Sequence, residues 1–171
     1  LTRHPGTPPG ELYPERLRRE IDELISVIDE NLALAVHQVV TATTSEAYTA
    51  ARRRFTATLH ELDGRLVHRR FLLGARLTLA DIRLWTLLVR YDLGYNPFAK
   101  ISKLRLVDFP QLWAYARDLY QRPPFRDTTD FQAISRLAAP PAPVPCYDAP
   151  WRVLVEPHLA DWESSHGRER L

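Results

Sequence analysis

Chemically reactive side chains are sparse in this sequence, and its one thiol lies late in the chain. Cys146 stands in the segment Val144-Pro145-Cys146-Tyr147-Asp148. A cysteine becomes a good nucleophile where a helix N-terminus or a neighbouring cation stabilises the thiolate, and the sequence predicts no helix start here. A lone thiol also cannot form an internal disulfide or a metal site built from cysteines alone. We therefore assign no catalytic residue to the chain.

Other polar groups gather without forming a site of known spacing. A superficial set of metal ligands near the C-terminus consists of His158, Asp161, Glu163 and His166. Their spacing matches no zinc signature, so we expect no metal. The basic runs Arg52-Arg53-Arg54 and His68-Arg69-Arg70 lack a glycine-rich loop that would cradle a phosphate. A solvated helix face is the simpler interpretation of both runs.

The sharpest local pattern is the segment Leu77-Thr78-Leu79-Ala80-Asp81-Ile82. Thr78 can cap a helix while the Asp81 carboxylate reaches back to the Thr78 amide, which is a capping box with Asp in place of Glu or Gln. Leu77 and Ile82 have the spacing of a hydrophobic staple. A catalytic role for Asp81 is the alternative, but no second acid or histidine lies at nearby helical spacing. The pattern therefore predicts a structural cap at the start of a central helix.

Apolar side chains recur every three or four positions through most of the chain, which indicates helices. These helices position the residues described above. The helical patterns run from about Pro14 to Val40, Thr44 to Leu66, Thr78 to Val89, Phe109 to Tyr120 and, in a short element, Thr128 to Leu137. The pattern from Thr78 is apolar nearly all round, as in a helix buried on several sides. No alternation of period two is long enough for a sheet. The sequence therefore predicts an all-α bundle of about five helices.

Length and proline content divide the chain into a folded unit and two ends. The 171 residues are 45% apolar, which suffices for one globular core. The 14 prolines concentrate towards both termini. We therefore expect an extended segment over residues 1–11, a helical domain over 12–138 and a flexible, proline-rich tail over 139–171. Apolar residues such as Trp151 and Trp162 leave open whether the tail docks on the bundle.

Charge and hydropathy exclude several classes of partner. The formal charge of +2 results from 23 basic and 21 acidic side chains, so there is no basic field for nucleic acid. No apolar run approaches the roughly 18 residues of a membrane span, and no signal-peptide core precedes the helices. We expect neither nucleic acid nor a membrane as partner, and a cytoplasmic location. The chain contains no methionine, so we expect translation to start upstream of Leu1.

Longer motifs resemble one protein family. Phe71-Leu72-Leu73-Gly74, followed by the capped helix, resembles the helical C-terminal domain of glutathione transferases. More specific segments are similar to the glutathionyl-hydroquinone reductases, or Xi class: Asp22-Glu23-Leu24-Ile25, Thr43-Thr44-Ser45-Glu46-Ala47-Tyr48, Leu88-Val89-Arg90-Tyr91-Asp92 and residues 109–121. The resemblance runs from about Leu12 to Ile134, and so includes nearly all of the expected helical domain.

The resemblance implies a division of labour between two domains. In that family glutathione and a catalytic cysteine in a Cys-Pro-Trp context belong to an N-terminal thioredoxin-like domain. The helical domain supplies the wall of the electrophile pocket and the dimer contacts. No thioredoxin-like pattern precedes the helices here, and Cys146 is a poor match for the family cysteine. The chain resembles half an enzyme: we expect no cofactor in it, no activity from it alone, and glutathione as co-substrate once the other domain is supplied.

The resemblance also implies substrate-binding residues. Tyr95 falls on a pocket tyrosine that follows the Val-Arg-aromatic-Asp segment, and Tyr91 holds the aromatic position within that segment. A phenol can hydrogen-bond to a quinone oxygen while its ring stacks on the substrate. Packing in the core or at a helix end is the alternative for both. The family's third pocket tyrosine corresponds here to His37, which can hydrogen-bond and titrate near neutrality.

Two functions follow. The first is the helical C-terminal domain of a glutathione-transferase-like protein, whose parent activity is glutathione-dependent reduction of glutathionyl-hydroquinones. The alternative is a free-standing, non-catalytic helical module that binds a small aromatic ligand or a partner protein. The first interpretation predicts a quinone-like ligand and a homodimer, or contact with a thioredoxin-like domain or partner chain, because a surface that is normally covered would otherwise be exposed.

Overall fold

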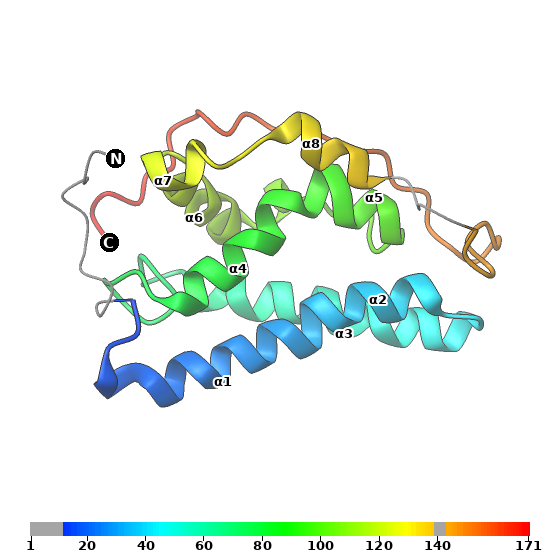
Figure 1. Ribbon diagram of the computed structural model, residues 1–171, viewed down its shortest axis with the longest axis horizontal. Coiled ribbons are helices and arrows are strands. Elements are labelled where there is room, and N and C mark those ends of the chain that lie inside the picture. Colours follow the sequence, from blue (N-terminus) through cyan, green and yellow to red (C-terminus); the bar gives the residue numbers. More distant parts are fainter. Residues whose placement is uncertain (1–11, 139–142) are drawn as a thin grey trace.

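The computed structural model describes residues 12–138 and 143–171, and it is built from helices (Figure 1). The α-helices are α1 (Arg18–Ile28), α2 (Leu34–Thr41), α3 (Ser45–Arg65), α4 (Leu79–Arg90), α5 (Asn96–Ala99), α6 (Pro110–Tyr120), α7 (Pro123–Arg126) and α8 (Phe131–Ser135). Single turns of 3₁₀-helix occur at Glu15–Leu17, Leu106–Asp108 and Arg136–Ala138. The described residues contain no β-strand, only an isolated bridge between Phe71 and Gly74. The prediction of an all-α fold is confirmed.

The first two helices form one continuous rod, joined by the π-helical turn Asp29–Ala33 (Figure 1). By length and composition alone, Glu15–Thr41 could cross a membrane. Its apolar stripe, however, faces the bundle: Ile21 and Ile28 are fully buried, while Arg19 forms an exposed ion pair on the other side. This two-faced pattern is typical of a helix that packs in a core.

α3 returns antiparallel to the first rod, and α4 crosses between that layer and a second layer made by α6, α7 and α8 (Figure 1). α4 contacts both α1 and α6. Its residues Leu84, Leu87 and Val89 are buried, although their spacing points them in different directions around the helix. α4 is therefore the central helix of the bundle.

The start of α4 is held by the carboxylate of Asp81. This carboxylate accepts hydrogen bonds from the amide and the hydroxyl of Thr78, each at 2.8 Å. Its other oxygen accepts from the Leu72 amide at 2.8 Å and from the Tyr115 hydroxyl at 3.0 Å. Burial raises the pKa of Asp81, and these hydrogen bonds offset that rise only in part. The capping box thus also connects α4 to the preceding loop and to α6.

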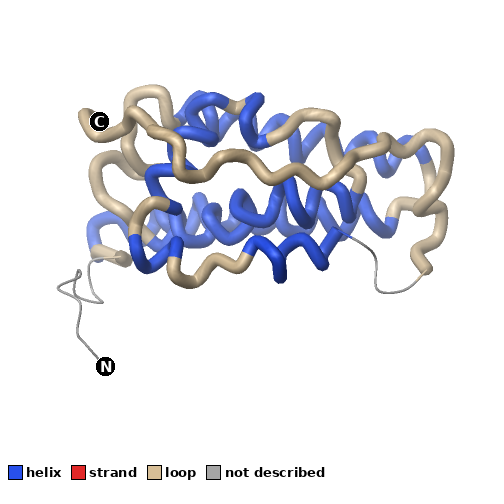
Figure 2. The backbone as a smooth tube through the Cα atoms, turned by 90° about the horizontal axis from the view of Figure 1, so that it is seen from above, coloured by secondary structure: helices blue, strands red, loops and turns tan. Residues whose placement is uncertain are grey.

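The segment 143–171, here termed the C-terminal strap, lies along the bundle as an extended chain without regular helix (Figure 2). Trp162 of the strap is buried. Its ring lies 5.8 Å from that of Trp85, 5.0 Å from Trp113 and 5.6 Å from Tyr120, measured between centroids. The strap therefore docks on the bundle, which the sequence left open. Residues 139–142 of the expected flexible tail lie outside the described residues.

Two buried arginines hold the ends of the strap. The Arg152 guanidinium donates to the carbonyls of Val40 and Ala42, each at 2.9 Å, where α2 ends. The Arg168 guanidinium donates to the Leu66 carbonyl at 3.2 Å, where α3 ends. The last carbonyls of a helix lack partners within it and attract cations. Each arginine therefore caps a helix and fixes the strap at once. The proline content of this segment does not reveal such anchors.

Candidate functional site

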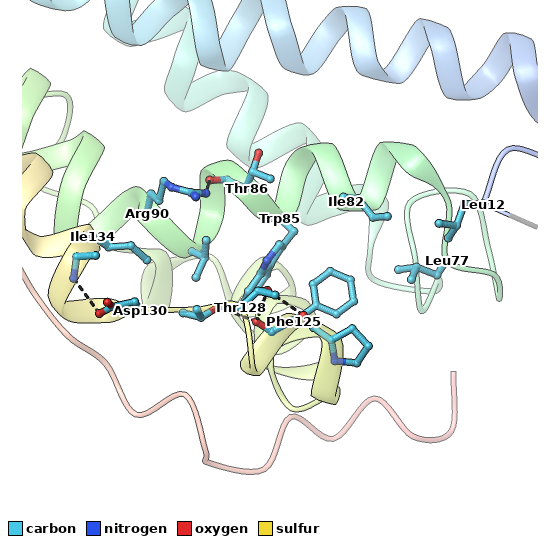
Figure 3. Close-up of a pocket in the computed structure, with 14 residues that line it drawn as sticks. Leu12, Leu77, Ile82, Trp85, Thr86, Arg90, Phe125, Thr128, Asp130 and Ile134 are labelled. Carbon is cyan, nitrogen blue, oxygen red and sulfur yellow. Dashed lines mark hydrogen bonds between the residues drawn. The ribbon is translucent and has the colours of Figure 1, made fainter. Parts of the chain in front are cut away.

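A cavity of about 700 Å³ opens between α4 and the α7–α8 segment (Figure 3). Ligand pockets in proteins commonly span roughly 300–1,000 Å³. Ile82, Trp85 and Val89 line the cavity from one face of α4, where their spacing of three and four residues places them in a row. Phe125 of α7 and Ile134 of α8 line the opposite side. The lining is mostly apolar, as expected of a site for a small organic molecule.

The aromatic wall of this cavity is built in two layers. The rings of Trp85 and Phe125 meet edge to face, with centroids 5.4 Å apart. Behind them, the Trp162 ring of the strap meets Trp85 edge to face. Such contacts favour one ring orientation over others. The strap therefore helps to hold Trp85, which makes it part of the support of the cavity.

The cavity has a polar end and an apolar end. Figure 3 shows Arg90 and Asp130 at one end, and Leu12 and Leu77 at the other. The Arg90 guanidinium donates one hydrogen bond, at 2.7 Å, to the carbonyl of Thr86 in the same helix. The geometry suits an elongated ligand with an apolar body and a polar group at one tip.

Tyr91 lies in the core rather than in this cavity. It opens the π-helical turn Tyr91–Tyr95 and is 2% exposed. Its ring stacks on that of Phe55 at 5.6 Å, and its hydroxyl donates to the Leu104 carbonyl at 3.2 Å. Burial, with the nearby negative charge of Asp92, raises its pKa well above the ordinary value. The structure thus places Tyr91 in the packed position that the sequence offered as the alternative to substrate binding.

Tyr95 and His37 lie away from the cavity, towards the region where α2 contacts α5. Tyr95 ends the π-helical turn and is partly buried against the core. His37 is exposed on α2, and its backbone carbonyl accepts a hydrogen bond from the Thr41 hydroxyl. Neither residue lines the α4–α7–α8 cavity. The three residues expected to bind substrate are therefore not brought together there.

Sequence reasoning missed the residues that do line the cavity. In the sequence, Trp85 is one apolar residue of a helix that is apolar nearly all round, and no motif distinguishes Phe125. The second wall exists because Pro123 and Pro124 start a short helix that folds back over α4. A pair of prolines signals a break in a helical pattern, but it does not say against which element the chain packs next.

A second, smaller cavity of about 210 Å³ lies between the turn after α4 and the strap. Asp92 lines it, together with Arg105 and His158. Burial raises the pKa of Asp92 to about 6, although the Leu106 amide donates to both of its oxygens at 3.1 Å. The His158 amide donates to the Asp92 carbonyl at 3.1 Å. Asp92 is thus a buried titratable group beneath the strap.

The thiol and the polar residues near the C-terminus do not form a common site. Cys146 is exposed, and its sulfur lies 3.7 Å from the Thr43 carbonyl oxygen. His166 lies 3.9 Å from a carboxylate oxygen of Asp118, which is bound by Arg70 and Arg122. Across residues 12–138 and 143–171, no three His, Cys, Asp or Glu side chains are grouped as metal ligands.

Comparison with known proteins identifies the bundle. Residues 45–118 match the sequence profile of the family described as glutathione S-transferase, C-terminal domain. Glutathionyl-hydroquinone reductase YqjG of Escherichia coli is 36% identical over 162 residues, which make up 91% of this chain and 49% of that protein. Glutathionyl-hydroquinone reductase PcpF of Sphingobium chlorophenolicum is 41% identical over 107 residues, or 63% of this chain and 34% of that protein.

The same relationship appears in three dimensions. The glutathione-bound structure of YqjG, a glutathione transferase homolog from Escherichia coli K-12, aligns with a TM-score of 0.81 at 32% identity. The alignment covers 96% of this chain and 53% of YqjG. The chain thus spans about half the length of this curated relative. The chain carries the helical C-terminal domain of the glutathione S-transferase family and is homologous, over that domain, to glutathionyl-hydroquinone reductases.

Proposed function

We propose that this chain supplies the acceptor-binding half of a glutathione-dependent reductase of glutathionyl-hydroquinones. The observation that carries the proposal is its 36% identity to a reductase of that name over 91% of the chain. The cavity between α4 and α7–α8 supports it, because its aromatic wall suits a planar hydroquinone ring. Thiol chemistry of this kind belongs in a reducing compartment, so we also propose a cytoplasmic location.

The reaction needs a cysteine thiolate and glutathione, which a thioredoxin-like domain would supply. The thiolate attacks the sulfur of the adduct: the carbon–sulfur bond to the ring breaks, a sulfur–sulfur bond forms, and the ring carbon takes a proton. A second glutathione then reduces the mixed disulfide and leaves as oxidised glutathione. In this scheme Trp85 and Phe125 hold the ring and exclude water from it.

The three residues that the family motif indicates, Tyr91, Tyr95 and His37, have roles outside the α4–α7–α8 cavity. Tyr95 and His37 contact parts of the substrate that extend beyond the cavity, towards the α2–α5 end. Tyr91 supports the π-helical turn that carries Tyr95, because its hydroxyl and its ring are both engaged in the core. Turns of π-helix within α-helices occur frequently at functional sites.

A fusion protein tests the proposal. The thioredoxin-like half of YqjG is joined to this chain, and reduction of a glutathionyl-hydroquinone is followed at saturating glutathione. We expect turnover from the fusion. Trp85→Leu should raise KM for the hydroquinone adduct by about tenfold or more. Trp113→Leu is the matched control: Trp113 also touches Trp162 but does not line the cavity, so its KM should stay within about twofold.

The isolated chain provides the complementary measurement. We expect it to have no reductase turnover with glutathione, and Cys146→Ser should change nothing, because Cys146 is distant in sequence and context from the family cysteine. Robust turnover that Cys146→Ser abolishes would place the nucleophile in this chain and overturn the division into two halves. An inactive fusion that is folded and binds glutathione would overturn the proposed reaction.

A further inference from the structure

Arg90 is a cation without an ion-pair partner in a mostly apolar cavity. It is the last residue of α4 and lines the polar end of the cavity (Figure 3). Its side chain makes one hydrogen bond, to the Thr86 carbonyl. A guanidinium has five N–H donors, so several remain available. Among the residues that the structure describes, no carboxylate lies within ion-pair distance of Arg90, whereas Arg70, Arg83 and Arg122 each have one.

The other charged group at this end is directed elsewhere. Asp130 is the N-cap of α8, and its carboxylate accepts a hydrogen bond from the Ala133 amide at 2.9 Å. A carboxylate at a helix N-terminus is stabilised there by the exposed amides. Asp130 therefore caps α8 and forms no ion pair with Arg90 beside the aromatic wall.

We propose that Arg90 selects aromatic acceptors that carry an anionic oxygen. The ring packs against Trp85 and Phe125, and the anionic oxygen, a carboxylate or a phenolate, accepts charge-assisted hydrogen bonds from Arg90. A neutral ring of the same size gains no charge-assisted hydrogen bond from the guanidinium, so the cavity binds it less tightly. This inference rests on the proposed function, since it names the substrate class of the same cavity.

The test uses the isolated chain and two probes of equal size, 2-naphthoate and the neutral 2-naphthamide, titrated by calorimetry. We expect the wild-type chain to bind naphthoate at least about tenfold more tightly than naphthamide. Arg90→Gln should abolish this preference while leaving naphthamide affinity within about twofold. Arg90→Lys keeps the charge and should retain a preference, which separates loss of charge from loss of fold.

Two further variants sharpen the result. Arg126→Gln is the matched control, because it removes a cation from α7 next to Phe125 without altering the lining of the cavity. It should keep the wild-type preference. Asp130→Asn retains an acceptor for the Ala133 amide but removes a negative charge from the polar end, so naphthoate should bind more tightly.

The outcomes separate this inference from the proposed function. A preference for naphthoate that survives Arg90→Gln, or that Arg126→Gln removes equally, overturns the role of Arg90. Binding of neither probe to the wild-type chain overturns it as well. Failure of the reductase fusion, with the naphthoate preference intact and dependent on Arg90, would reject the reaction and leave the anion-selective cavity standing.

Discussion

The Asp81 carboxylate satisfies donors from three separate parts of the chain: the loop amide of Leu72, the cap residue Thr78 and the Tyr115 hydroxyl of α6. Asp81→Ala would leave these buried donors without an acceptor. Each unsatisfied buried group costs about 1–3 kcal/mol, so we expect the free energy of unfolding to fall by about 3 kcal/mol or more in urea.

The chain contains a natural control for this measurement. Asp108 accepts a hydrogen bond from the Arg105 amide at 2.8 Å in an exposed capping arrangement with the same spacing. Asp108→Ala removes a similar local bond, but water can reach the freed amide. We expect a loss of about 1 kcal/mol or less. Equal losses in the two variants would mean that burial adds nothing to the role of Asp81.

Asp92 makes stability depend on pH in the opposite direction from most carboxylates. Its pKa is about 6 in the folded chain, against an ordinary value of 3.8, because burial disfavours the charged form. Between these values the folded chain binds a proton that the unfolded chain has lost. Unfolding then releases a proton, so the free energy of unfolding falls as pH rises through this window.

Asp92→Asn isolates this effect. The asparagine keeps an acceptor for the Leu106 amide but cannot ionise. Relative to the variant, the wild-type chain should lose up to about 3 kcal/mol of unfolding free energy between pH 4 and pH 7. Urea denaturation of both chains across this range gives the difference in unfolding free energy. A difference that does not vary with pH would contradict the raised pKa of Asp92.

Among elements, the C-terminal strap shows how irregular chain can stabilise a helical bundle. Trp162 is 7% exposed and contacts aromatic rings from α4, α6 and α8. Trp162→Ala should open a cavity and lower the free energy of unfolding by about 3–5 kcal/mol. Leu159→Ala is the control in the same segment: its side chain is 55% exposed, so the change should stay within about 0.5 kcal/mol.

A strap that merely rests on the surface would give a different result. Trp162→Ala would then leave the urea midpoint unchanged. Hydrogen exchange adds an independent readout, because the Arg168 amide and its neighbours should lose protection together with the bundle rather than before it. Early loss of protection confined to the strap would indicate a segment that opens on its own.

The elements differ in how far the sequence predicts them. The helical spacing of apolar residues in α1–α2, α3 and α4 is a local property of the chain. The capping box of Thr78 and Asp81 likewise marks a helix start within six residues. The strap and the cavity depend on contacts between distant segments, such as Arg152 with α2 and Phe125 with Trp85. A single sequence carries no signal for such pairs. The family motif correctly indicated the bundle, but it could not reveal that Tyr91 points into the core.

At the scale of the whole molecule, the question is which surfaces of the bundle stay uncovered. From the sequence, an exposed apolar surface could be covered by the tail, by a second copy of the chain or by a separate partner. The strap covers the region around Trp113 and Tyr120 through Trp162. Apolar side chains remain exposed on the outer face of the first rod, where Val27 is 37% and Leu34 is 47% exposed. Both side chains therefore lie on the side of the rod that faces away from the core.

We expect the chain to form a homodimer at micromolar concentration that buries this face, because a two-fold pair covers the same patch on both copies with one interface. Leu34→Lys would place two charges in that interface and should shift the chain to a monomer in sedimentation equilibrium. Leu154→Lys, at the most exposed apolar residue of the strap, is the control and should remain a dimer. A wild-type monomer would contradict the expectation. A chain that ends at Ala138 lacks Trp162, so the aromatic cluster that the strap covers becomes exposed. This surface is separate from the dimer face. We therefore expect the shortened chain to aggregate with or without Leu34→Lys.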